Sequence, residues 1–64
     1  MTVQTYTNQQ KFDAVERELK YRVRVYARRV AEGKMTAELA KYQQEIFQAI
    51  AEDYRAKLDA ERLL

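Results

Sequence analysis

Apolar residues recur at helical spacing along two long segments of this 64-residue chain. In the first segment they follow one another at intervals of three or four, a spacing that places them on one face of an α-helix. The stripe consists of Phe12, Val15, Leu19, Val23, Tyr26 and Val30. The pattern predicts an amphipathic helix over about residues 8–32.

The second segment has a wider apolar stripe. Its members are Leu39, Tyr42, Ile46, Phe47, Ile50, Tyr54 and Leu58. Adjacent members such as Ile46 and Phe47 widen the stripe beyond the face that one partner helix covers. The pattern predicts a helix over about residues 37–62, packed against more than one neighbour.

Local signals mark where these helices begin and end. Gly33 is the only glycine in the chain, and there is no proline. Glycine readily adopts the left-handed conformation that ends many helices, which predicts a turn at residues 33–35. Thr7 and Gln10 have the spacing of a capping box, although Asn8 is an alternative N-cap, and Thr36 is a good N-cap for the second helix. Residues 1–6 are expected to form a flexible or extended arm.

The size of the chain favours one small domain with an added source of stability. Sixty-four residues bury little surface in a single core, and the chain has no cysteine for disulfides and no histidine. Oligomerisation is the remaining way to bury more apolar area. We therefore predict an all-α fold, a two-helix antiparallel hairpin over residues 1–64 that forms a homodimeric four-helix bundle. The predicted core and dimer residues are Leu19, Tyr26, Ile46, Phe47, Ile50 and Tyr54.

Basic residues concentrate in the first half of the chain. Residues 1–34 carry eight basic and four acidic side chains, whereas residues 35–64 carry four basic and six acidic ones. At about 100° per residue, the basic residues of the first helix gather opposite its apolar stripe, with Tyr21 among them and Val25 beside Tyr21. Arg22 and Arg29 flank the stripe. The acid–base pairs Asp13–Arg17, Glu16–Lys20 and Glu18–Arg22 have the i,i+4 order that stabilises a helix.

This basic side of the first helix is the predicted binding surface. Arginine binds carboxylate and phosphate groups through paired hydrogen bonds, so the surface suits a macromolecular partner that carries either group. We expect an unidentified protein partner; the alternative is nucleic acid, held through its phosphates and stacked on Tyr21. A solvated surface without a specific partner is the simplest interpretation. The predicted partner-binding residues are Arg17, Lys20, Tyr21, Arg24, Val25 and Arg28.

The sequence lacks the patterns of most catalytic and cofactor sites. Phosphate-binding loops and nucleophile elbows need glycines that are absent here, and a di-metal bundle site needs histidine. We expect no enzymatic activity, no cofactor and no metal. No apolar run approaches the roughly 20 residues that span a bilayer, and the N-terminus does not resemble a signal peptide. The expected location is the cytoplasm, without a membrane partner.

Part of the chain resembles a known group of proteins. The similar positions run from Val15 to Tyr54 and comprise Val15–Leu19, Arg22, Val25–Tyr26, Val30, Gly33–Met35, Ala40, Glu45, Ala49–Ile50 and Asp53–Tyr54. This pattern resembles small, uncharacterised helical-hairpin proteins encoded in phages and prophages of proteobacteria. In that group a proline often follows the Val-Tyr pair, where this chain has Ala27, so its first helix should be straighter. The resemblance implies an accessory phage protein and assigns no reaction or site residue.

Overall fold

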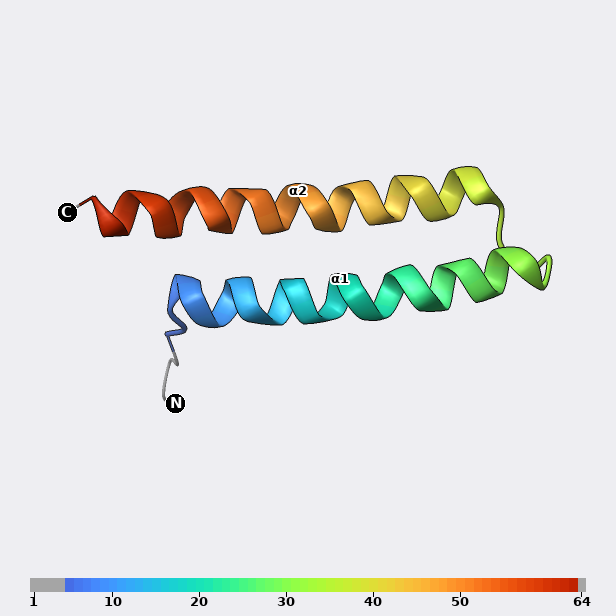
Figure 1. The fold of residues 1–64 in the computed structure, drawn as a ribbon, viewed down its shortest axis with the longest axis horizontal. Helices are drawn as coiled ribbons and strands as arrows, with labels where there is room; N and C mark the ends of the chain where they lie inside the picture. Colours follow the sequence, from blue (N-terminus) through green and yellow to red (C-terminus); the bar gives the residue numbers. More distant parts are fainter. Residues whose placement is uncertain (1–4, 64) are drawn as a thin grey trace.

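Two antiparallel helices form the fold (Figure 1). The computed structural model describes residues 5–63, with α1 at Asn8–Ala31 and α2 at Ala37–Arg62. These bounds agree with the expected ranges to within one residue at each end. Most of the predicted N-terminal arm lies outside the described residues; Thr5 and Tyr6 are exposed and non-helical. Neither described helix has a stretch long and apolar enough to cross a membrane.

Side chains cap both helix N-termini. The Gln10 backbone N–H donates to Thr7 Oγ1 at 3.0 Å, and the Thr7 backbone N–H donates to Gln10 Oε1 at 2.8 Å. This confirms the predicted capping box. Asn8, the alternative cap, instead donates its side-chain amide to Glu61 Oε1 at 2.7 Å, which joins the two helices at their open end. At the start of α2, the Leu39 N–H donates to Thr36 Oγ1 at 3.1 Å.

Gly33 ends α1 in the left-handed conformation that was predicted for it, with φ at +72°. Its N–H donates to the Val30 carbonyl at 3.0 Å, and the Lys34 N–H donates to the Arg29 carbonyl at 2.9 Å. These are the two hydrogen bonds of a Schellman motif, and they satisfy carbonyl groups that the helix end leaves without partners. The chain thereby reverses direction within a few residues.

We expect Gly33→Val to destabilise the hairpin by at least about 1 kcal/mol, because a residue with a Cβ is strained at positive φ. Among the described residues no atom lies within 4 Å of a Cβ built at Gly33, so the cost arises from the backbone alone. Gly33→Asn should cost less, since asparagine tolerates this conformation. Urea unfolding of the three proteins measures the difference. Equal stability of Gly33→Val and the parent would contradict the argument.

The helices meet along one seam. The α2 positions that face α1 alternate in spacing between four and three residues, as in a coiled coil, and all are buried or half-buried. We call them the inner seam: Ala40, Gln44, Phe47, Ala51, Tyr54 and Leu58. The matching α1 positions are Asn8, Phe12, Val15, Leu19, Arg22 and Tyr26, also buried or half-buried. The predicted core residues Leu19, Tyr26, Phe47 and Tyr54 therefore lie between the helices, and Ile50 is half-buried at the edge of the seam.

Several apolar residues of the two predicted stripes lie outside the contact between the helices. Val23 is 45% exposed, and its neighbour Arg22 occupies the seam position instead. On α2 the large apolar residues that are exposed are Leu39, Tyr42 and Ile46. Ala40 and Ala51, which do not belong to the predicted apolar stripe, are buried on the inner seam, where their small side chains let the helices approach closely. The wide stripe of α2 thus faces α1 along only part of its width.

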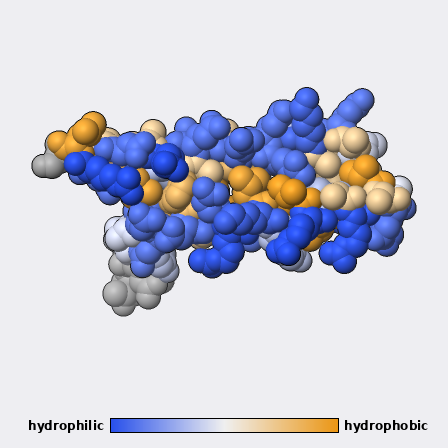
Figure 2. Space-filling view, viewed as in Figure 1, coloured by the Kyte–Doolittle hydropathy of each residue, from blue (hydrophilic) through white to orange (hydrophobic). Residues whose placement is uncertain are grey.

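The hairpin is a single layer of helices. Its extent along the shortest axis is 14 Å, little more than the diameter of one helix. In Figure 2, an apolar strip runs between the hydrophilic side chains of the two helices on the side in view. The described residues that are buried are Tyr26, Ala40, Ala51 and Leu58. One layer cannot cover both of its faces, so much apolar surface stays open to solvent.

Candidate partner-binding surface

The basic residues predicted to bind a partner are exposed on one side of α1. They extend over twelve residues, 17–28, or about 17 Å of helix. We call this surface the basic face: Arg17, Lys20, Tyr21, Arg24 and Arg28. Tyr21, at the centre of the face, is 58% exposed. The side chains are therefore positioned to reach a partner without disturbing the contact with α2.

The cations of the basic face have no acidic partner within the described chain. Of the three i,i+4 pairs expected on α1, only Glu18–Arg22 forms, with 3.2 Å between Glu18 Oε1 and Arg22 Nε. Asp13 instead accepts a hydrogen bond from the Gln9 side chain at 2.8 Å. The other ion pairs between residues 5 and 63 are Glu32–Lys34, Lys41–Glu45 and Arg55–Asp59. The positive charge of the face is therefore not neutralised by intramolecular pairs.

Two carboxylates border the basic face at its N-terminal end. An open hollow on α1 is lined by Asp13, Glu16, Arg17, Lys20 and Arg24. Acidic and basic groups thus share the same part of the surface. A partner with both kinds of charge can pair with this arrangement, whereas a uniformly anionic one meets repulsion at that end.

Val25, the sixth predicted partner-binding residue, is less accessible than the residues of the basic face. It is half-buried. It lies three residues after Arg22 and four before Arg29, so these three residues share one edge of the helix. Because Arg22 contacts α2, that edge turns toward the second helix.

Arg22 connects the two helices and is distinct from the basic face. Its guanidinium carbon lies 4.3 Å from the centroid of the Phe47 ring, a cation–π contact between α1 and α2. Its Nη1 donates to the Tyr26 hydroxyl at 2.8 Å. That hydrogen bond is the main cause that raises the pKa of Arg22 above its ordinary value. The long apolar stem and charged head allow arginine to fill a seam position that is half-open to water.

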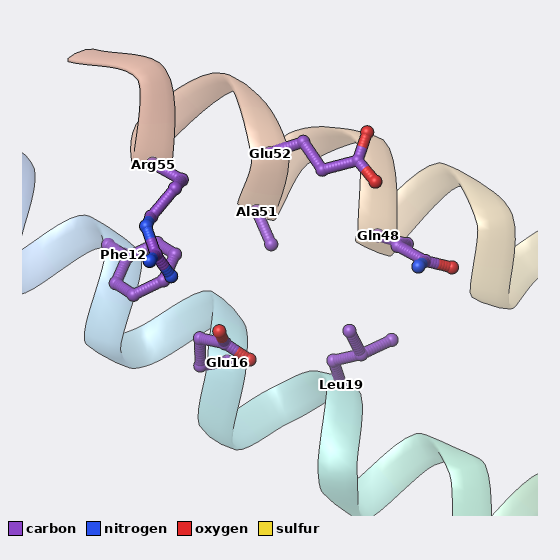
Figure 3. Close-up of a pocket in the computed structure, with 7 residues that line it drawn as sticks. All are labelled: Phe12, Glu16, Leu19, Gln48, Ala51, Glu52 and Arg55. Atoms are coloured by element: carbon purple, nitrogen blue, oxygen red, sulfur yellow. The ribbon is translucent and has the colours of Figure 1, made fainter. Parts of the chain in front are cut away.

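A second hollow lies between the helices, and sequence reasoning did not find it. Its volume is about 210 Å³, and Figure 3 shows Phe12 and Leu19 of α1 opposite Ala51 of α2, with carboxylates of both helices nearby. The full lining is Phe12, Glu16, Leu19, Gln48, Ala51, Glu52 and Arg55. These residues come from both helices, so their proximity depends on the pairing of the helices and not on any local motif.

Among residues 5–63, no three acidic side chains lie close enough together to hold a metal ion. The chemistry available on α1 is that of exposed guanidinium, ammonium and phenol groups, which bind by charge and stacking.

Comparisons with known protein families, with curated proteins and with solved structures find no match to this chain.

Proposed function

We propose that the chain is a small interaction protein that binds an acidic protein partner through the basic face of α1. In this proposal it acts as a homodimer in which two hairpins form a four-helix bundle, has no catalytic role, and originates from a phage or prophage. The observation that carries the proposal is the row of exposed cations without acidic partners on one side of α1. Guanidinium groups in that state are available for paired hydrogen bonds to carboxylates.

A protein partner suits this surface better than nucleic acid does. Asp13 and Glu16 line the same hollow as the cations. A phosphate backbone is anionic along its whole length and is repelled there, whereas an acidic protein can also place a basic side chain opposite these two carboxylates. The net charge of the whole chain is only +2, far from the strongly basic balance of committed nucleic-acid-binding domains.

Nucleic acid remains the alternative because of Tyr21. An exposed aromatic ring among cations offers a platform on which a base can stack. The two partners differ in their response to salt. Binding through several phosphates weakens steeply between about 50 and 200 mM salt, whereas an interface with mixed charges and an apolar centre weakens less.

We expect the double variant Arg24→Glu with Arg28→Glu to weaken binding of an acidic peptide at least about tenfold. Each exposed ion pair contributes up to about 1 kcal/mol, and reversing the charge adds repulsion to the loss. Its Tm should stay within a few degrees of the parent, because both residues are exposed. Fluorescence anisotropy of a labelled glutamate-rich peptide, and of single- and double-stranded DNA, measures binding across the salt range.

A matched control is Lys41→Glu with Arg55→Glu, which changes the net charge equally on exposed residues of α2. It should retain most of the peptide binding. If both double variants lose binding equally, only net charge matters and the basic face is not a site. If DNA binds more tightly than the peptide with a steep salt dependence, the alternative replaces the proposal.

A further inference from the structure

The second helix carries two seams, and only one of them faces α1. The other consists of Leu39, Tyr42, Ile46 and Ala49, all exposed, and we call it the outer seam. Its spacing of three, four and three residues is that of a helix packed against another helix. The next position in the series, Asp53, is the first charged one. The outer seam therefore has the spacing and the apolar character of a helix-packing surface.

The outer seam faces away from α1. Leu39 and Ile46 directly precede the inner-seam residues Ala40 and Phe47, so they lie about 100° around α2 from them. Tyr42 and Ala49 follow the same two inner-seam residues by two positions and lie about 160° from them. Gln48, which directly follows Phe47, lies on the opposite side and lines the hollow between the helices. The outer seam is thus separate both from that hollow and from the basic face on α1.

The exposed area of the chain leaves room for a dimer interface. The chain exposes 5479 Å², about a quarter more than the roughly 4,300 Å² that size scaling gives for a compact protein of 7.6 kDa. The excess is comparable with the roughly 800 Å² that each partner buries in a standard-sized interface. Exposure of Leu39, Tyr42 and Ile46 ranges from 40% to 52%, and no other element within residues 5–63 covers them.

We infer that α2 packs antiparallel against α2 of a second copy through the outer seam. This inference rests on the proposed homodimer and specifies its interface. A two-fold contact uses the same surface on both copies, which one apolar stripe along one helix can supply. Antiparallel packing also sets the helix dipoles in opposition, which is electrostatically favourable. The basic face of each copy stays free for a partner.

Light scattering and sedimentation of lysine variants test this interface. Leu39→Lys with Ile46→Lys should convert a dimer of twice 7.6 kDa into a monomer. The control, Ala37→Lys with Gln48→Lys, adds the same charge at exposed positions of α2 outside the seam and should remain dimeric. A dimer that survives the seam substitutions, or one that only the control dissociates, overturns the inference.

Disulfide trapping provides a second readout that does not depend on destabilising the fold. The chain has no cysteine, so Ile46→Cys introduces a single thiol at the centre of the outer seam. With the two-fold axis at the middle of the seam, the thiols of the two copies lie close to each other, within the roughly 7 Å between Cα atoms that a disulfide allows. Oxidation should link Ile46→Cys into a covalent dimer and leave Gln48→Cys unlinked. The reverse pattern would place the interface on the other side of α2.

The outcomes separate this inference from the proposals on which it rests. A parent protein that is monomeric at every concentration overturns both the homodimer and the interface. A dimer linked through Gln48→Cys overturns the interface alone. The monomeric seam variant should still bind the acidic peptide, because the basic face lies on the other helix. If that variant is folded and monomeric but no longer binds the peptide, the outer seam and the basic face do not act independently.

Discussion

Tyr26→Ala is expected to lower the free energy of unfolding by about 3 kcal/mol, the lower end of the cost of truncating a buried aromatic ring. Tyr26 is 7% exposed, the lowest exposure among the aromatic residues described, and its hydroxyl accepts the hydrogen bond from Arg22. Its loss would remove ring contacts and leave the Arg22 head without that acceptor. For a domain of this size, the expected cost is a large part of the total stability. Urea unfolding followed by circular dichroism measures it.

The matched control for this variant is Tyr21→Ala. Tyr21 belongs to the same helix but is 58% exposed, so its truncation should change stability by no more than about 0.5 kcal/mol. Two equal losses would show that Tyr26 is not at the core of the hairpin. If only Tyr21→Ala lost stability, the face of α1 that packs in the core would be the one that carries Tyr21, which contradicts the structure.

Ile50→Asp is the second substitution with a large expected effect, at about 2–4 kcal/mol. Ile50 is half-buried at the edge of the inner seam, next to the outer seam, so a carboxylate there disturbs both the hairpin and the inferred dimer. Thermal melting at several protein concentrations separates the two contributions, because only the dimer term depends on concentration.

Gln48→Asp provides the control for Ile50→Asp. It introduces the same charge two residues earlier, at an exposed position on the other side of α2. We expect its Tm to remain close to that of the parent and to depend on concentration as the parent does. If Ile50→Asp were as stable as this control, Ile50 would contribute to neither interface.

The features of the fold that depend on residues close together in the sequence could be predicted from the sequence. The Thr7–Gln10 capping box requires only two residues three positions apart, and the positive φ of Gly33 follows from the turn that must separate two helices. The exposed basic face was also predictable, because it follows from helical spacing opposite a strong apolar stripe. None of these features requires knowledge of how the helices pair.

The features that depend on the pairing of helices could not be predicted in this way. Arg22 and Val23 are adjacent, and hydrophobicity alone favours Val23 for the seam. Arg22 suits its position on the seam because its guanidinium stacks over the ring of Phe47. The location of that ring relative to α1 is known only once the two helices are paired. In the same way, the stripe of α2 contains two seams, and the sequence does not distinguish the one that faces α1. The hollow between Leu19 and Ala51 arises from the same pairing.

The most direct test of the basic face is an NMR titration of the isotope-labelled chain with the glutamate-rich peptide. The account predicts saturable chemical-shift changes concentrated at Arg17, Lys20, Tyr21, Arg24 and Arg28, with the amides of Leu39 and Ile46 unaffected. Shifts that are centred on the outer seam or on the hollow between the helices, or a peptide that causes no saturable change at any concentration, would contradict the claim that α1 carries the binding surface.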